Sequence, residues 1–318
     1  MNVTTVNAQR DGRLLTVYLH NPPRNLMTVG MVKELDALTR SIEHDRAIRA
    51  VVITSSSSDT FLTHFDVEAL MANAQAAPGE LSAWQANLIL RATNALGRIP
   101  GLGTVLDHFL LAGMRALLRV HELFLRWNQM DKVFIAAING LALGGGCELA
   151  LACDLRYMMD NEHCRIGLPE AAFGIIPGGG GTQGLARLLG SGQALELLLE
   201  GRTLNATEAV VIGLVHRALP SGRLLEEAHE TAERLARRSP VTVEAIKHAA
   251  YKSGSRSLRD GLRIEQAGFL VAASSSQGQQ GMSEWVRRYP SNTPLPSVEL
   301  LAQLPQWQRG EVIGLGER

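Results

Sequence analysis

The stretch AINGLALGGGCELALACDLRY, residues 137–157, decides the fold. The short apolar run VFIAAI at 133–138 leads into it and is closed by Asn139 and Gly140, a pattern typical of a buried strand that ends in a turn. The triple glycine Gly144–Gly146 comes next, and the helix-forming run CELALACD follows directly. The stretch therefore predicts a strand, a glycine turn and the start of a helix.

The glycine turn is a candidate binding site for negative charge. The first amides of a helix have no intrahelical partner and point outward at the positive end of the helix dipole. Glycine also lets a ligand approach the backbone closely. Such a turn suits an anion or a developing oxyanion, but a tight turn packed on a neighbouring element explains the glycines equally well.

Two glutamates near glycines are candidate acid/base groups. Glu148 lies one turn into the predicted helix, where an acidic residue commonly only complements the helix dipole. Glu170 is followed by the apolar, glycine-rich stretch AAFGIIPGGGG, which is unusual for a solvated carboxylate. Two carboxyl groups in apolar surroundings do not both ionise readily, so one would keep its proton. The pair could then supply a general acid and a general base.

The rest of the chain predicts a parallel sheet followed by helices. The segments 13–20, 48–54 and 155–159 are short, strand-like runs. Between the first two, Met31, Leu35, Leu38 and Ile42 form one helical face. Strands alternating with helices indicate an α/β core. Helical periodicity dominates after residue 190, over the ranges 194–200, 206–212, 224–238, 241–252 and 257–274.

The segment 76–130 differs from its surroundings. Its apolar-rich part, 104–127, predicts an amphipathic helix with two distinct faces. The polar stripe comprises Arg115, Arg119, Glu122 and Arg126, and the apolar face comprises Leu106, Leu110, Leu117 and Phe124. Asp107, His108, Arg115 and Arg119 interrupt any membrane span of about 20 residues. We expect packing on protein, with a membrane-surface role as the alternative.

Composition excludes several classes of partner. Lys+Arg and Asp+Glu both number 31 in 318 residues, so no global charge indicates nucleic acid or an anionic membrane. Cys147, Cys153 and Cys164 match no zinc or disulfide pattern, and the N-terminus has no apolar core behind a basic start. These features predict a cytoplasmic protein in a reducing compartment.

A dinucleotide-binding fold is the obvious structural alternative. Gly178–Gly181 precede a helical run, but the spacing fits the dinucleotide fingerprint only trivially and no strand leads straight into it. The sequence also contains no phosphate-binding P-loop motif. We therefore disfavour a nicotinamide enzyme.

Residues 137–157 resemble the signature of the crotonase (enoyl-CoA hydratase/isomerase) family. The blocks IGLPEAAFGIIPGGGGTQGLARLLG (166–190) and ALELLLEGRTLNATEAVVIGLVHRALP (194–220) are similar to the family's next block. NPPRNLMTVGMVKEL, AVVITS and SPVTVEAIKHAA add to the resemblance, which covers roughly residues 10–72 and 121–290. It implies a superhelix of ββα repeats with a C-terminal helical region.

The resemblance also implies residue roles. Glu148 and Glu170 fall on the two hydratase glutamates, and the amides of Phe65 and Gly145 fall on the oxyanion hole. The implied substrate contacts are Arg24, Leu26, Thr63, His64, Gly144 and Pro169. One departure is clear, since FLTHFD (61–66) places His64 where the family has glycine. His64 is then either a third catalytic group or a packing or gating residue.

These implications give a set of expectations. The chain would hydrate a 2-enoyl-CoA reversibly in lipid metabolism, without metal or redox cofactor, since coenzyme A is part of the substrate. An enoyl-CoA isomerase and a non-catalytic acyl-CoA-binding paralogue are the alternatives.

Residues 1–220 would form the core with a helical insertion at about 76–120, over the acyl chain or at a subunit contact. Residues 221–290 would form a homotrimer or hexamer contact, and 291–318 an extended tail.

Overall fold

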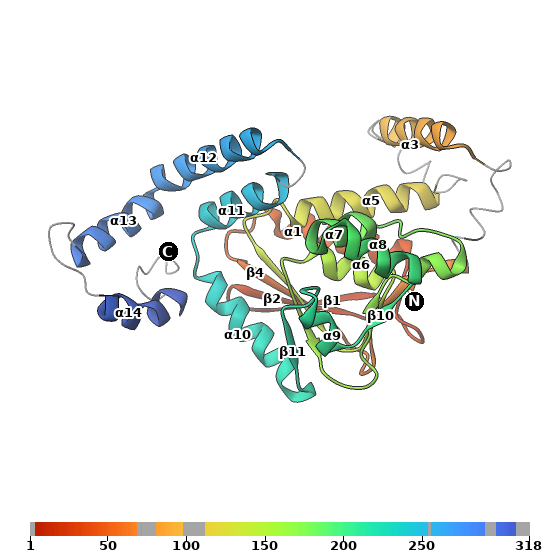
Figure 1. Cartoon of the computed structure of the whole chain (residues 1–318), viewed down its shortest axis with the longest axis horizontal. Helices are drawn as coiled ribbons and strands as arrows, with labels where there is room; N and C mark the ends of the chain where they lie inside the picture. The colour runs from red at the N-terminus through yellow and green to blue at the C-terminus, as the bar shows by residue number, and fades with distance from the viewer. Residues whose placement is uncertain are drawn as a thin grey trace.

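The computed structural model describes residues 4–68, 81–97, 112–253, 256–289 and 297–309, together with Met71 (Figure 1). Two sheets and the helices around them share one hydrophobic core. The predicted mixed α/β class and the C-terminal run of helices are confirmed.

The larger sheet has six strands in the order β1-β2-β4-β6-β8-β11. These strands are β1 (Val6–Asp11), β2 (Leu14–Leu19), β4 (Ala50–Ser55), β6 (Val133–Ile138), β8 (Leu155–Met159) and β11 (Arg217–Leu219). All neighbours run parallel except β1 and β2. Every residue of β4 and of β6 is buried, because central strands of a parallel sheet are covered on both faces.

The smaller sheet has five strands in the order β10-β9-β7-β5-β3. They are β3 (Leu26–Met27), β5 (Thr60–Phe65), β7 (Leu141–Leu143), β9 (Ile166–Gly167) and β10 (Thr203–Leu204). The chain alternates between the sheets, so that β2, β4, β6 and β8 each precede one strand of the smaller sheet. This alternation is the ββα repeat that the resemblance implied.

Helices cover both faces of the larger sheet. On one face α10 (Leu224–Ala236) packs on β2, β4, β6 and β8, while α1 (Val29–Glu43) and α5 (Ala112–Trp127) pack on each other (Figure 1). Trp127 of α5 stacks on Phe134 at a centroid distance of 5.0 Å and donates from Nε1 to Thr39. The remaining helices of the core are α6 (Gly145–Ala152), η1 (Glu170–Phe173), α7 (Gly181–Leu189), α8 (Ser191–Glu200), α9 (Ala206–Val211) and η2 (Ser221–Arg223).

The segment expected to be a helical insertion contains α3 (Ala83–Gly97) and the start of α5. Phe124 is buried as predicted for the apolar face, and Arg126 of the polar stripe pairs with Glu43. Leu106, Leu110, Asp107 and His108 lie outside the described residues. Val120, Leu123 and Phe124 of α5 belong to the hydrophobic core, and within the described part of the segment α3 packs on the outer side of α5 (Figure 1). None of the helices described is long and apolar enough to cross a membrane.

The C-terminal helices are α11 (Pro240–Ser253), α12 (Leu258–Ser274), α13 (Ser276–Arg288) and α14 (Ser297–Arg309). A polar cluster fixes α11 to the core. The buried Lys247 donates to Asp154 (2.7 Å) and to the carbonyl of Lys132 (2.6 Å), and Tyr251 donates to the other oxygen of Asp154 (2.9 Å). Asp154 directly follows α6 and its C-cap Cys153, so the cluster joins α11 to the end of that helix.

The expected extended tail is instead helical where the structure describes it. Residues Ser297–Arg309 form α14 although Pro305 lies inside this helix. Trp307 packs against Trp285 and Tyr289 at centroid distances of 5.1 and 6.1 Å, and its carbonyl accepts a hydrogen bond from Arg238. These aromatic contacts bury apolar surface, which explains why the segment does not stay extended.

Candidate active site

Three turns meet at one edge of the smaller sheet. His64 and Phe65 end β5, Gly144–Gly146 follow β7, and Glu170 follows β9 after two residues. The strands β5, β7 and β9 are parallel neighbours, so their carboxyl ends lie side by side. Ligands of parallel α/β sheets bind outside this edge. The fold thus brings together the residues for which the sequence predicted chemistry.

The turn after β7 requires its glycines. Gly144 has a φ of +55°, which side chains disfavour, and its amide donates to Gly167 of β9 at 3.0 Å. A β-carbon at Gly146 would collide with the backbone carbonyl of Leu62 in β5. The turn is therefore tightly packed and also opens α6 at the sheet edge, and its binding of an anion or oxyanion stays a prediction.

The backbone amides of Phe65 and Gly145 border the same space. A β-carbon added at Gly145 would lie 3.3 Å from the Phe65 nitrogen and 3.4 Å from Sδ of Met27. Gly145 begins α6, so its amide belongs to the first turn, whose N–H groups have no intrahelical acceptor. The geometry is compatible with two donors to one carbonyl oxygen. Their oxyanion role stays a prediction.

Glu148 is held by the second glycine run. Its side chain lies in α6, and the residue is only 7% exposed. Oε1 accepts hydrogen bonds from the amides of Gly179 (2.7 Å) and Gly181 (2.9 Å). Burial raises the pKa of Glu148, while the two amides and the nearby His121 act in the opposite direction. Glu148 is thus a buried, hydrogen-bonded carboxyl rather than a surface group on the helix dipole.

Glu170 has different surroundings. It is the first residue of η1, and its Oε2 is buried without a hydrogen-bond partner in the described part of the chain. Burial, with a smaller contribution from the charge of the neighbouring Glu148, raises the pKa of Glu170 to about 7. Glu170 therefore keeps its proton to near neutral pH, whereas amides stabilise the charged form of Glu148. This difference is what an acid/base pair needs.

His64 lies beside Glu170 at the Gly144 turn. A β-carbon at Gly144 would lie 2.9 Å from Oε1 of Glu170 and 3.1 Å from Nδ1 of His64. The His64 side chain is half-buried, and burial lowers its pKa. The ring is therefore uncharged at neutral pH.

The other residues that the sequence predicted to contact substrate lie close to the three turns. Leu26 of β3 pairs with Thr63 of β5, and the hydroxyl of Thr63 donates to the carbonyl of Arg24 at 2.8 Å. Pro169 immediately precedes Glu170 as the N-cap of η1. The Arg24 side chain is exposed. Substrate binding by these residues stays a prediction.

Sequence reasoning missed the residues that surround Glu148. Gly179 and Gly181 were considered only for a dinucleotide motif, yet their amides hold the carboxylate. On α5, Leu117 and Val120 approach Gly178 and Gly179, each 3.3 Å from a β-carbon built there, and His121 contacts the Gly178 carbonyl at 2.7 Å. The glycine run itself was the available signal.

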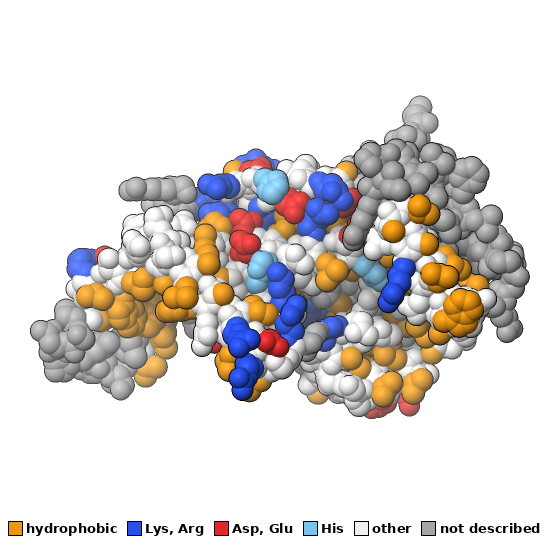
Figure 2. Space-filling model, turned by 90° about the horizontal axis from the view of Figure 1, so that it is seen from above, with side chains coloured by type: hydrophobic (Ala, Val, Ile, Leu, Met, Phe, Trp, Pro, Cys, Tyr) orange, Lys and Arg blue, Asp and Glu red, His pale blue; other side chains and the backbone are white. Residues whose placement is uncertain are grey.

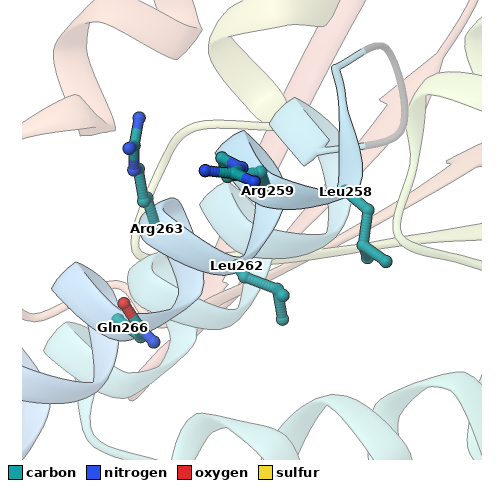
Figure 3. Close-up of a pocket in the computed structure, with 5 residues that line it drawn as sticks. All are labelled: Leu258, Arg259, Leu262, Arg263 and Gln266. Carbon is teal, nitrogen blue, oxygen red and sulfur yellow. The ribbon is translucent and has the colours of Figure 1, made fainter.

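A shallow pocket elsewhere belongs to a single helix. Figure 3 shows its lining residues, all from α12: Leu258, Arg259, Leu262, Arg263 and Gln266. The two leucines point to one side and the two arginines to the other (Figure 3). None of the three turns contributes to it, so it is not the candidate site.

The chain matches a family model and several known proteins. The family model described as enoyl-CoA hydratase/isomerase matches residues 115–292. The chain is 30% identical to the crotonyl-CoA hydratase of Syntrophomonas wolfei, over 89% of this chain and 95% of that protein. It is 28% identical to the short-chain-enoyl-CoA hydratase of Clostridium acetobutylicum, over 91% of this chain and 97% of that protein.

A solved structure shows the same fold. The crystal structure of an enoyl-CoA hydratase from Bacillus anthracis superposes with a TM-score of 0.71 at 26% identity, covering 89% of this chain and 96% of that one. The matched family model spans residues 115–292, and the relative from Syntrophomonas wolfei is 30% identical over most of both chains. The chain belongs to the enoyl-CoA hydratase/isomerase family.

Proposed function

We propose that the protein is an enoyl-CoA hydratase, which adds water reversibly to a 2-enoyl-CoA and gives a 3-hydroxyacyl-CoA. The observation that carries this proposal is the pair Glu148 and Glu170. One carboxyl is held by two amides, and the other keeps its proton to a pKa of about 7. Family membership supplies the acyl-CoA substrate class.

The proposed mechanism assigns each group one task. The amides of Phe65 and Gly145 donate to the thioester oxygen and stabilise negative charge that develops there. The ionised Glu148 accepts a proton from water, whose oxygen bonds to Cβ, and Glu170 delivers its proton to Cα. The double bond is consumed and no electrons leave the substrate. We propose that neither a metal nor a redox cofactor takes part, with coenzyme A entering as part of the substrate.

The two-carboxyl arrangement favours hydration over the alternatives. A double-bond isomerase needs one base that moves a proton between carbons, so a second positioned carboxyl would be unnecessary. A non-catalytic paralogue would have no reason to keep a buried carboxylate on two amides, because burying a charge is costly. Arg24 is our candidate for the CoA phosphates because its side chain is exposed beside β5.

We also propose a homotrimer or hexamer assembled through the C-terminal helices. Phe269, Leu270 and Val271 of α12 and Val286 of α13 are all more than half exposed in the single chain. Figure 2 shows hydrophobic side chains gathered at the end of the molecule that carries these helices. Exposed apolar patches of this kind mark interfaces.

We also propose a cytoplasmic location. Cys147, Cys153 and Cys164 are buried and free, which suits a reducing compartment.

Replacing either glutamate should abolish most of the activity. Glu148→Gln and Glu170→Gln preserve side-chain volume, but an amide can neither accept nor deliver the proton of the reaction, so hydration of crotonyl-CoA should fall by about 10²–10⁴-fold in each. The loss of absorbance of the conjugated thioester measures the rate. Glu200→Gln, an exposed change on α8, is the matched control and should retain full activity. Turnover at the wild-type rate in either active-site variant would refute the assignment.

The Glu170→Gln variant should also be more stable than the wild type at alkaline pH. The pKa of Glu170 is about 7 in the fold against an ordinary 4.5, so the folded state holds a proton that the unfolded chain loses between these values. The free energy of unfolding of the wild type should therefore fall as pH rises through this window, and glutamine removes that loss. Thermal unfolding on both sides of the window measures the difference. A gap between the proteins that does not change with pH would contradict the prediction.

The wall that α5 forms beside the candidate site should influence the preference for acyl chain length. Leu117 approaches Gly178, next to the amide that holds Glu148, whereas Leu125 on the same helix is 57% exposed. If this wall contacts the acyl chain, Leu117→Ala should lower kcat/KM for long 2-enoyl-CoAs by about tenfold relative to crotonyl-CoA, since each buried CH₂ contributes about 0.8 kcal/mol. Leu125→Ala should leave the ratio unchanged. A flat chain-length profile in Leu117→Ala would exclude this role.

The assembly should depend on the exposed face of α12. Phe269→Glu places a charge in the proposed contact and should yield a lower molar mass by light scattering than the three or six chains expected for the wild type. Gln266→Glu adds the same charge to an exposed polar position on the same helix and serves as the control. An unchanged mass in Phe269→Glu, or a monomeric wild type, would disprove the contact.

A further inference from the structure

His64 stands where this chain departs from the pattern of the family that it resembles. The glycine of that pattern has no side chain, whereas here an imidazole follows Thr63 and directly precedes Phe65, whose amide borders the active site. The ring is half-buried at the end of β5 rather than extended into solvent.

Among the described residues, the carboxyl group of Glu170 lies close to the His64 ring. Nδ1 of His64 and Oε1 of Glu170 both lie about 3 Å from the point where Gly144 would carry a β-carbon. The two atoms therefore flank the same point at the Gly144 turn. The other titratable groups around the pair are Glu148 and Cys147 of α6 and, through Glu148, His121 of α5.

Glu170 lacks a partner of its own for one oxygen. Its Oε2 is buried with no hydrogen-bond partner among the described residues. A carboxyl that is free to rotate about its last bond would present its proton in many directions, and a misplaced catalytic group can cost about 10²-fold in rate. Something must orient this carboxyl, and the His64 ring lies beside it.

A neutral imidazole is suited to a carboxyl that alternates between two states. It has one N–H donor and one acceptor nitrogen, so it can pair with the protonated and the ionised form alike. A permanent cation in its place would favour the ionised form and remove the proton that Glu170 must deliver. An apolar side chain would offer no partner to either form.

We propose that His64 is a positioning residue that acts through Glu170 and holds its carboxyl over Gly144, in the orientation that exchanges a proton with Cα. The inference rests on the proposed hydratase function. It goes beyond that function in giving this chain a third polar group at the proton-transfer step, in a position that is glycine in the family pattern.

The test compares three substitutions at one position. His64→Leu keeps the bulk but removes the polar atoms, His64→Asn keeps a neutral donor and acceptor, and His64→Gly restores the family pattern. With crotonyl-CoA, we expect kcat to fall by about 10–100-fold in His64→Leu and His64→Gly while KM changes little, and His64→Asn to recover part of the loss. His229→Leu replaces another half-buried histidine, which contacts Thr16 outside the site, and should keep the wild-type kcat.

A second measurement isolates the step assigned to Glu170. In D₂O the Cα protons of butyryl-CoA exchange for deuterium, and mass spectrometry measures the rate of this exchange. The exchange requires proton transfer at Cα but no addition of water. His64→Leu should slow this exchange about as much as it slows hydration. In a Glu170→Gln background, His64→Leu should cause no further loss, because its effect passes through the missing carboxyl.

The outcomes separate the two proposals. A wild-type protein that neither hydrates crotonyl-CoA nor exchanges Cα protons would overturn the hydratase function, and the role of His64 with it. The role of His64 alone would be overturned if the wild type is active and His64→Leu has the same kcat. Additive losses in the His64→Leu, Glu170→Gln double variant would overturn it as well. A rise in KM without a fall in kcat would likewise assign His64 to substrate packing instead. Circular dichroism establishes that each variant is folded.

Discussion

The parallel pairing of β5, β7 and β9 is the constraint on which the site depends. These strands are short, and β9 has only two residues, yet their order places three separate turns at one sheet edge. The Gly144 amide that donates to Gly167 joins the second turn to the third strand, and Gly146 packs directly on β5. A side chain at Gly146 would collide with the backbone of Leu62 and push α6 away from β5, and the amides of Phe65 and Gly145 would no longer border one space.

This edge gives two chemically identical side chains different properties. Glu148 reaches back to the amides of Gly179 and Gly181, which offer the charged carboxylate two hydrogen bonds. Glu170 lies in η1 with one oxygen unpartnered in the described structure, and its pKa rises to about 7. Burial raises the pKa of both carboxyls, and at Glu148 the amides of Gly179 and Gly181 oppose this rise. The acid and the base are thus distinguished by the backbone that surrounds them.

The sequence predicted the parts of this arrangement that have strong local patterns. The strand at 133–138, the glycine turn and the helix carrying Glu148 were placed correctly because apolar runs and glycines mark them directly. The short strands β3, β7 and β9 were not predicted, because two or three residues have no periodicity and exist only through pairing with distant segments. The role of Gly179 and Gly181 was missed for the same reason, since their partner Glu148 lies more than 30 residues earlier in the chain. The helix α14 was missed because Pro305 argues against a helix, while the aromatic contacts that favour it are long-range.

The short helix α6 connects two parts of the molecule that would otherwise be independent. It begins with the Gly145 amide, carries Glu148, and is followed by Asp154, which holds Lys247 and Tyr251 of α11. Arg156, buried beside it, donates to the carbonyls of Ala150 and Cys153 at the same end. A substitution that loosens the contacts of Lys247 or Tyr251 with Asp154 therefore acts on the same short helix that carries Glu148. Inherited changes in α11, far from the sheet edge, would then slow turnover in a chain that still folds.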